Sequence, residues 1–177
     1  MPLKDPAAPH TWHDELQRLR GRTAQHGLAD LSKLGALSGL EFLRSIIAGT
    51  IPDPPIGRTL DFYLCEAEPG RAAFLGQAGF AHYNPIATVH GGWHATLLDS
   101  AMACAIHTLV PAGRAYTTLE FKIHCVRPLT ERTGPVRAEG RVVSSGRRTA
   151  TSEARLVDTA GKLYSHGTTT CMIFEGS

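Results

Sequence analysis

The sequence predicts an α+β fold in which an antiparallel β-sheet is wrapped around one long central helix. Two observations predict it. After residue 55 the chain is mostly strand-like runs separated by short turns, and short turns join antiparallel neighbours. Among these runs lies one segment, about 92–109, that is apolar on nearly all sides. Because such a helix must be surrounded, the simplest arrangement is a sheet that curls around it.

The composition fits one domain with a real core and a terminal extension: 177 residues, of which 42% are hydrophobic. The net charge is +2 and the cations are scattered, which excludes the clustered basic face of a nucleic-acid-binding protein. The N-terminus lacks the apolar region of a signal peptide, and the longest apolar run is too short and too polar to span a membrane. We therefore expect a cytoplasmic protein without a membrane segment.

We expect residues 1–55 to form a partly helical N-terminal extension and residues 56–177 to form the main domain. Residues 1–11 contain three prolines and are expected to be disordered. Residues 12–49 have a helical pattern, which the prolines of "GTIPDPPIG" then end. The apolar positions at helical spacing are Leu37, Leu40, Leu43 and Ile47.

Six runs are expected to be strands, two before the central helix and four after it. Alternation is clearest in "GPVRAEGRVVSSG", where small or apolar residues alternate with charged ones. The four later strands are joined mostly by short turns, so we expect antiparallel neighbours. The six runs are 58–68, 70–77, 115–128, 134–146, 147–159 and 162–174.

The four cysteines are expected to be small buried hydrophobic residues of a protein in a reducing compartment. None belongs to a CxxC pair and their flanks are apolar, which argues against a disulfide framework or a zinc site. They are Cys65, Cys104, Cys125 and Cys171.

Two features of the central helix require a chemical explanation. It begins with His90-Gly91-Gly92, and the first N–H groups of a helix have no intrahelical partner, so this end suits a developing oxyanion. The alternative is that the glycines only permit a tight turn. Asp99 lies among apolar residues, where an unpaired carboxylate is disfavoured. Either it has a functional role, or a neighbouring arginine or backbone N–H groups satisfy it.

The spacing of these two features constrains any shared site. Gly91 and Asp99 are eight positions apart, which is roughly 12 Å along one helix. If both act on one substrate, they must therefore come from two chains. The sequence then predicts a homodimer with two equivalent sites across its interface.

The stretch "HYNPIATVHGGWHATLLDSAMACAIH" resembles the signature of the hotdog-fold acyl-CoA thioesterases, most closely the phenylacetate-pathway and 4-hydroxybenzoyl-CoA types. The resemblance extends over about residues 56–174. It implies the hotdog fold and a dimer with a continuous sheet, or a dimer of dimers (a homotetramer). It also implies hydrolysis of an aromatic or medium-chain acyl-CoA. No cofactor is needed, because coenzyme A is part of the substrate and leaves as product.

The resemblance implies a role for each matching residue. The Gly91 N–H donates to the thioester carbonyl, and Asp99 of the other chain acts as general base or nucleophile. Asn84 positions the thioester or the water. His90 orders the loop and contacts the carbonyl region, and Thr118 places a hydroxyl near the attacking water.

Further residues are candidates for substrate binding. Gly92 adds a second open backbone N–H, and Trp93 either lines an acyl pocket or packs against the partner chain. The guanidinium groups of Arg127, Arg147 and Arg148 suit the phosphates of coenzyme A, the alternative for the last two being a solvated turn.

The chain departs from the family pattern in two places. Ala87 occupies a position where glycine is usual, which reshapes the loop. His94 occupies an often apolar position and has i, i+4 spacing to His90, which can suit a metal. Because no third ligand is evident, we expect no metal site and take His94 as a pocket-lining or hydrogen-bonded core residue.

Two other functions compete with hydrolysis. Hotdog-fold hydratases and dehydratases are one, but they usually carry an Asp-His pair in a different motif. A non-catalytic acyl-CoA-binding protein is the other, but it would normally lack an acid such as Asp99 on the helix.

Overall fold

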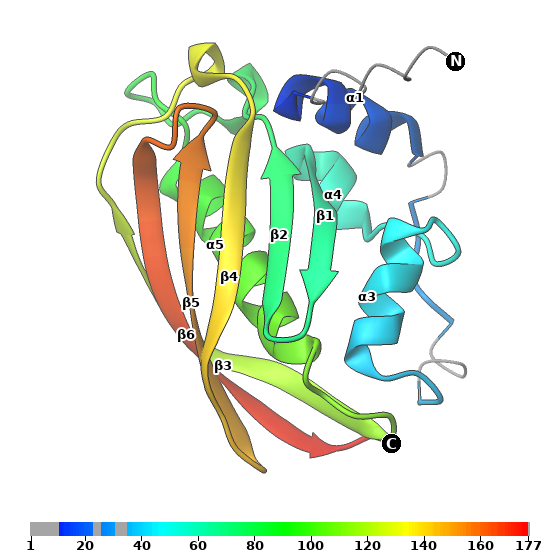
Figure 1. Cartoon of the computed structure of the whole chain (residues 1–177). Helices are drawn as coiled ribbons and strands as arrows, with labels where there is room; N and C mark the ends of the chain where they lie inside the picture. Colours follow the sequence, from blue (N-terminus) through cyan, green and yellow to red (C-terminus); the bar gives the residue numbers. More distant parts are fainter. Residues whose placement is uncertain (1–10, 23–25, 31–34, 177) are drawn as a thin grey trace, which may run out of the picture.

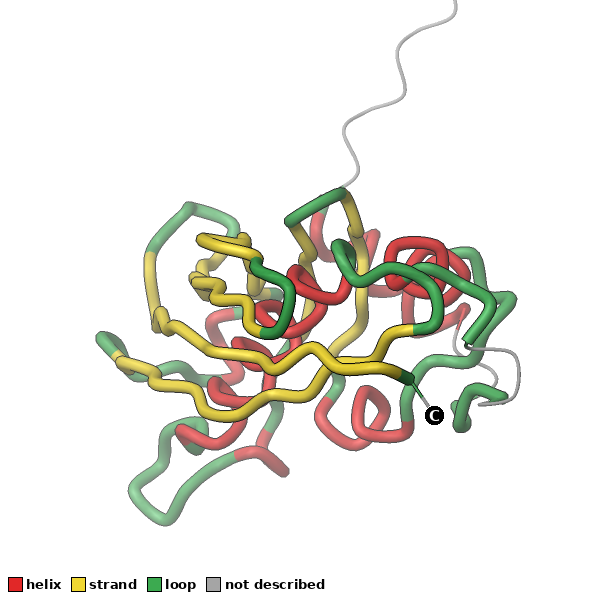
Figure 2. The backbone as a smooth tube through the Cα atoms, turned by 90° about the horizontal axis from the view of Figure 1, so that it is seen from below, coloured by secondary structure: helices red, strands yellow, loops and turns green. Residues whose placement is uncertain are grey.

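A six-stranded antiparallel sheet curls around the long helix α5 (Gly91–His107), as the sequence predicts (Figure 1). The computed structural model describes residues 11–22, 26–30 and 35–176, so the expected disorder of residues 1–11 falls almost wholly outside the described residues. Seen from below, the strands wrap the helix on several sides (Figure 2). The strands are β1 (Phe62–Glu68), β2 (Arg71–Gly76), β3 (Arg114–Cys125), β4 (Val136–Ser145), β5 (Thr149–Asp158) and β6 (Leu163–Glu175).

The strand order is β1-β2-β4-β5-β6-β3, so β3 pairs with β6 and forms an edge of the sheet. The expectation of antiparallel neighbours holds for β4, β5 and β6 but is wrong for β3 and β4. The chain between these two strands includes the short helix η2 (Glu131–Thr133), and it is longer than a hairpin turn. This connection therefore crosses the end of the sheet from the edge strand β3 to β4.

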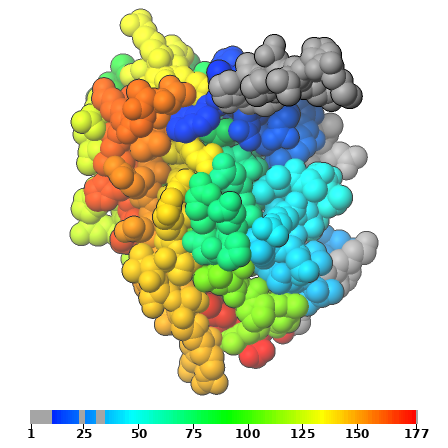
Figure 3. Space-filling view, in the orientation of Figure 1, coloured from blue at the N-terminus to red at the C-terminus, as the bar shows by residue number. Residues whose placement is uncertain are grey.

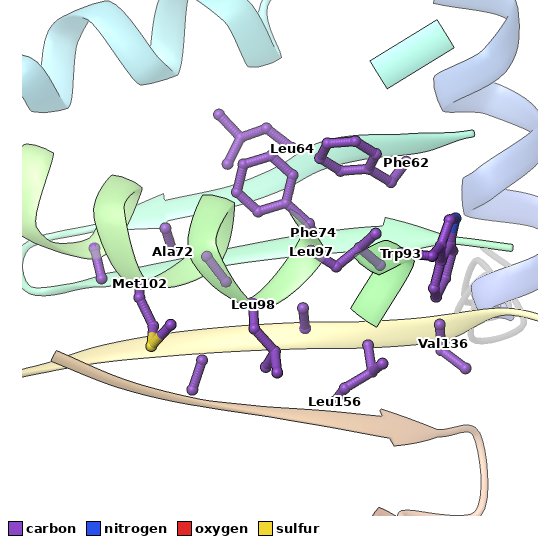
Figure 4. Packing of buried hydrophobic residues seen from close by; sticks show 14 of the residues in the cluster. Phe62, Leu64, Ala72, Phe74, Trp93, Leu97, Leu98, Met102, Val136 and Leu156 are labelled. Atoms are coloured by element: carbon purple, nitrogen blue, oxygen red, sulfur yellow. The ribbon is translucent and has the colours of Figure 1, made fainter. Parts of the chain in front are cut away.

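The core lies between α5 and the concave face of the sheet. Figure 4 shows Leu97, Leu98 and Met102 of α5 packed among apolar side chains of the strands. At Gly140 of β4, an added Cβ would lie 2.1 Å from the carbonyl oxygen of Ala101. This glycine therefore allows the strand to approach the helix backbone closely.

The cysteine prediction is confirmed in part. Cys65 and Cys171 are buried and all four cysteines are free. Cys125, however, is exposed at the end of the edge strand β3, because no further strand among the described residues covers that edge.

In the described part of the chain, the helices that precede the sheet are α1 (Trp12–Arg22), α3 (Gly39–Ile47) and α4 (Pro55–Leu60). The helical expectation for 12–49 is therefore right for α1 and α3 but wrong for 26–30 and 35–38, which are not helical. Ser38 is the N-cap of α3 and forms a capping box with Glu41, so Leu37 lies before the helix.

The strand expected at 58–68 begins only at Phe62, because α4 occupies its first residues. The domain division expected at residue 55 falls at the start of this helix. Within the described ranges, no helix is long and apolar enough to cross a membrane.

The N-terminal helices pack on two sides of the sheet. Leu16 and Leu19 of α1 pack against outward-facing side chains of β1 and β2. Leu43 and Ile46 of α3 join the main core beside β1. Figure 3 shows this segment, in cyan, lying directly against the green surface of the first two strands.

Candidate functional site

The first turn of α5 leaves one backbone donor free. His90 is the N-cap, and its Nδ1 accepts a hydrogen bond from the Gly92 N–H at 2.8 Å. Gly92 is therefore not the second open donor that the sequence suggests. The Gly91 N–H has no acceptor among the described residues. A Cβ at Gly91 would meet nothing within 4 Å, so neither backbone conformation nor packing requires glycine there.

The loop before α5 is held together by Asn84. Its Oδ1 accepts from the N–H groups of Ile86 (3.0 Å) and Thr88 (3.3 Å), and its Nδ2 donates to the Thr88 hydroxyl at 2.8 Å. Ala87 has φ = 63°, the left-handed region that favours glycine. Ala87 therefore adopts a conformation that favours glycine, the residue usual at this position in the family pattern, and this leaves it strained.

Asn84, Gly91 and Arg127 lie around one hollow of about 290 Å³, which we call the Gly91 hollow. Arg127 is exposed and donates from Nη1 to the Leu163 carbonyl at 2.6 Å. His94 also lines this hollow; it is buried, with Nδ1 3.1 Å from the Ser165 hydroxyl, and burial lowers its pKa. The remaining lining residues are Thr88, Val89, Cys125, Val126 and Pro128.

The interpretation of His94 as a hydrogen-bonded, pocket-lining residue is confirmed. Its partner Ser165 is 71 residues away in the chain, so no local motif could have indicated it. Among the described residues, no group of three His, Cys, Asp or Glu side chains is placed to hold a metal ion.

Asp99 lies on the side of α5 that faces β3, and it is half-buried rather than fully enclosed by apolar residues. Its Oδ1 accepts a hydrogen bond from the Thr118 hydroxyl at 3.2 Å. Over the described part of the chain this is its one hydrogen bond, and no cation pairs with it. Among the described residues, neither an arginine nor a backbone N–H group therefore stabilises this carboxylate.

The pKa of the Asp99 carboxyl is raised, because burial disfavours its charged form more than the Thr118 hydroxyl stabilises it. A carboxylate whose negative charge is only partly solvated and only lightly hydrogen-bonded is well suited to accept a proton or attack a carbonyl.

The predicted site residues thus fall into two groups on one chain. Asn84, His90 and Gly91 gather at the start of α5, whereas Asp99 and Thr118 meet about two turns further along it. Asp99 does not line the Gly91 hollow. The roughly 12 Å between the two positions of the helix keeps the groups apart within a single chain.

Trp93 is not available to an acyl group or to a partner chain. Its side chain is 3% exposed, it packs in the main core, and its indole N–H donates to the Leu60 carbonyl at 2.9 Å. Both roles considered for it from the sequence are therefore wrong.

Arg147 and Arg148 lie at the turn between β4 and β5, at the opposite end of α5 from Gly91 (Figure 1). They line a separate hollow of about 240 Å³ together with Arg114, which the sequence did not single out. Arg114 joins them because the edge strand β3 pairs with β6, a contact that no spacing in the sequence indicates.

Comparison with known proteins identifies the family. A model of the thioesterase superfamily matches residues 87–165, the segment that holds α5 and most of the later strands. A solved mutant of the phenylacetic acid degradation protein PaaI from Thermus thermophilus is 32% identical, with a TM-score of 0.60. The match covers 67% of this chain and 97% of that protein. The chain belongs to the thioesterase superfamily.

Other solved structures agree with this assignment. A phenylacetic acid degradation-related protein from Ralstonia eutropha is 26% identical, with a TM-score of 0.67. The match covers 74% of the present chain and 98% of the Ralstonia chain. A thioesterase family protein from Silicibacter pomeroyi, 23% identical over 76% of this chain and 99% of its own, shares the fold with a TM-score of 0.67. None of the curated proteins compared with the chain matches it significantly.

The hotdog fold and the resemblance noted in the sequence are therefore confirmed. Membership of the thioesterase superfamily supports the hydrolysis of thioesters as the activity of this chain. The match of the family model begins at residue 87, so the helices and strands before it lie outside the matched segment.

Proposed function

We propose that this protein is an acyl-CoA thioesterase, which converts an acyl-CoA and water into a carboxylic acid and free coenzyme A. The observation that carries the proposal is the environment of Asp99. Its carboxylate is half-buried on the central helix, is not paired with any cation among the described residues, and has the Thr118 hydroxyl as its neighbour. Such a group serves no evident structural purpose but suits the activation of water.

In the general-base route, Asp99 takes a proton from a water molecule held near Thr118. The water oxygen forms a bond to the thioester carbonyl carbon, and the negative charge moves to the carbonyl oxygen. A backbone N–H that faces this oxygen stabilises the charge. When the tetrahedral intermediate collapses, the C–S bond breaks, and the proton goes to the leaving thiolate of coenzyme A.

In the alternative route, an oxygen of Asp99 attacks the carbonyl carbon directly. The C–S bond breaks, coenzyme A leaves as the thiolate, and a mixed anhydride forms. Water then hydrolyses the anhydride to the free acid and the Asp99 carboxylate, and the proton released from water goes to the thiolate. Both routes need an oxyanion donor and an ionised Asp99.

The donor in this proposal is the Gly91 N–H of the partner subunit, because the Gly91 of the same chain is too distant. The edge strand β3 offers a surface for such pairing. Among the described residues it has no neighbouring strand on its outer side, and Leu119 and Phe121 on it are 55% and 43% exposed. Exposed apolar edge strands readily pair with a second chain. Two copies joined along β3 would form one continuous sheet with two equivalent sites.

The coenzyme A end of the substrate requires cations for its phosphates. We assign this role to Arg127 at the Gly91 hollow and to the group of Arg114, Arg147 and Arg148, which lie together at the β4–β5 turn. No metal or other cofactor enters either route, because coenzyme A arrives with the substrate.

The first test measures release of free thiol from aromatic and aliphatic acyl-CoA esters. We expect release by the wild type and loss of release by Asp99→Asn. If the wild type binds acyl-CoA but hydrolyses none of the esters, the proposal is wrong and a binding protein or a hydratase is favoured.

The shared site is tested by mixing two inactive variants, Asp99→Asn and Gly91→Pro, after partial denaturation and refolding together. In a mixed dimer, one of the two sites would combine the intact Gly91 of one chain with the intact Asp99 of the other. Random pairing then restores about a quarter of wild-type activity. Sites built within single chains would remain inactive in every mixture, and this result would overturn the two-chain arrangement.

A further inference from the structure

An apolar cavity of about 360 Å³ lies between the N-terminal segment and the sheet. We call it the N-terminal chamber. One wall is formed by residues 27–29 and 52–54 and by Phe42 and Ile46 of α3. The opposite wall is formed by strands β1 and β2 and by Cys104, His107 and Tyr116 at the far end of α5 and the start of β3. The α3 wall stands beside β1 in Figure 1.

Among the described residues, the polar groups that face the chamber are uncharged at neutral pH, with one exception. Burial lowers the pKa of His107 to about 4, so its ring is neutral. Burial, with a smaller effect from the Asp99 charge, raises the pKa of the Cys104 thiol to about 12, so the thiol keeps its proton. The carboxylate among the described lining residues, Asp53, is buried and paired with Arg22 at 3.1 Å. The lining therefore suits a hydrocarbon or aromatic group and disfavours a charged one.

The chamber adjoins the Asp99 half of the proposed site. Tyr116 and Thr118 are two residues apart on β3, so their side chains lie on the same face about 7 Å apart along the strand. Thr118 donates to Asp99, while Tyr116 lines the chamber and lies 4.6 Å, centroid to centroid, from the His107 ring. Cys104 lies five residues after Asp99 on α5, and the charge of that carboxylate contributes to the raised pKa of the Cys104 thiol.

We propose that the N-terminal chamber binds the acyl group of the substrate and that the N-terminal segment thereby sets which acyl groups are accepted. The inference rests on the proposed function, since it assigns the acyl half of the same thioester. Of the chamber's walls, only the part contributed by α5 and β3 falls within the family match at 87–165. The walls from residues 27–29, 52–54 and α3 lie outside that match, so in this proposal the specificity depends in part on the N-terminal segment.

The size of the chamber indicates the class of acyl group. Small-molecule sites generally have volumes of about 300–1,000 Å³, and the chamber lies near the lower limit of that range. We therefore expect a medium-chain or single-ring acyl group to fill it, and a long fatty acyl chain to exceed it.

The test compares two variants that change the chamber in opposite directions. Ala29→Phe adds a ring at a half-buried position of the wall, whereas Phe42→Ala removes one. The matched control is Ala160→Phe, which makes the same change at an exposed position of the β5–β6 turn. For each protein, kcat/KM is measured with acetyl-, hexanoyl- and decanoyl-CoA, and the melting temperature verifies folding.

We expect Ala29→Phe to lower kcat/KM for hexanoyl- and decanoyl-CoA by about tenfold or more, which is the effect of even a small change in the fit of a hydrophobic pocket. Acetyl-CoA, which is too short to reach the added ring, should be unaffected. Phe42→Ala should shift the preference toward the longer chain, and Ala160→Phe should leave the profile unchanged. Chain-length profiles that are the same in all four folded proteins would overturn the inference.

A binding measurement separates this inference from the proposed function. The fluorescent apolar probe N-phenylnaphthylamine should bind the wild type and bind Ala29→Phe at least about tenfold more weakly. If no ester is hydrolysed, the proposed function fails, yet loss of probe binding in Ala29→Phe would still place an apolar ligand in the chamber. Hydrolysis without any effect of the chamber variants would instead overturn only the chamber.

Discussion

The two halves of the proposed site differ in what their side chains do in the folded chain. At the start of α5, the side chains of Asn84 and His90 are used to hold the loop and cap the helix, and what remains free is the backbone N–H of Gly91. Two turns later the opposite holds: the backbone of Asp99 lies inside a helix, and its carboxylate accepts only the hydrogen bond from Thr118 among the described residues.

The two halves should therefore respond differently to substitution. Side-chain changes in the loop alter stability first and reach the chemistry only through the position of the backbone. A change at Asp99 alters the chemistry directly. Substitutions in each half can test this division, and the largest effect is expected at Asp99.

Asp99→Asn should lower kcat by about 10²–10⁴-fold, the usual loss when a general base is removed. The melting temperature at neutral pH should not fall. Because the pKa of Asp99 is raised in the folded chain, its ionisation costs stability at any pH above its unfolded value, and the amide removes this cost. Thiol-release kinetics and thermal unfolding of the same samples provide the two measurements. A large drop in melting temperature would show that Asp99 is a structural residue and that its side chain is not reserved for the chemistry.

Gly91→Pro should lower kcat by about 10²–10³-fold, the effect of losing one oxyanion donor. Proline is well tolerated at the first position of a helix, and the extended conformation of His90 (φ −62°, ψ 137°) suits the residue before it. Helix α5 should therefore remain intact while the N–H is lost. The control is Gly91→Ala, which keeps the N–H and has open space for its Cβ. Equal losses in both variants would show that bulk, rather than the missing donor, is responsible.

Thr118→Val should move the rising limb of the kcat/KM profile to higher pH. The hydroxyl of Thr118 lowers the pKa of Asp99, so removing it raises that pKa further and delays ionisation as the pH increases. The neighbouring exposed residue offers a matched control, since Thr117→Val makes the same change without touching Asp99. If the profile does not move relative to this control, the Thr118 hydroxyl does not affect the pKa of Asp99.

The sequence predicts the strands and the central helix well because each has its own local pattern. The runs that become β4, β5 and β6 were placed within a few residues, and the apolar stretch identifies α5. The pairing of β3 with β6 was not predictable in this way, because it depends on contacts between segments far apart in the chain. The short helix α4 was missed because three prolines suggested only a loop, although Pro55 is suitable at a helix start.

For the site, spacing alone indicated that Gly91 and Asp99 of one chain lie too far apart to act on the same substrate. What it could not indicate was how side chains are engaged. Trp93 follows the glycines directly, yet its side chain lies in the core and its indole N–H donates to the Leu60 carbonyl. The N-terminal chamber, likewise, exists only because α3 and β1 meet across it, and neither segment carries a motif.

The smallest expected effect concerns the strained residue of the loop. Ala87→Gly should increase the free energy of unfolding by about 0.5 kcal/mol, because relief of a left-handed conformation (~1–2 kcal/mol) outweighs the added flexibility of glycine in the unfolded chain (~0.5–1 kcal/mol). The urea midpoint, at an unchanged slope, measures this effect. Ala81→Gly, at a nearby position without positive φ, is the control and should be destabilising.

The activity of Ala87→Gly tests whether the loop affects the chemistry only through the backbone. The hydrogen bonds of Asn84 to Ile86 and Thr88 do not involve the side chain of Ala87, so they should persist and keep the Gly91 N–H in place. A more stable protein with unchanged kcat would show that the loop serves the chemistry only by holding the backbone. A gain in stability accompanied by a loss of kcat would mean instead that the strain at Ala87 helps to position the donor, and the two halves of the site would then be less different than their contacts suggest.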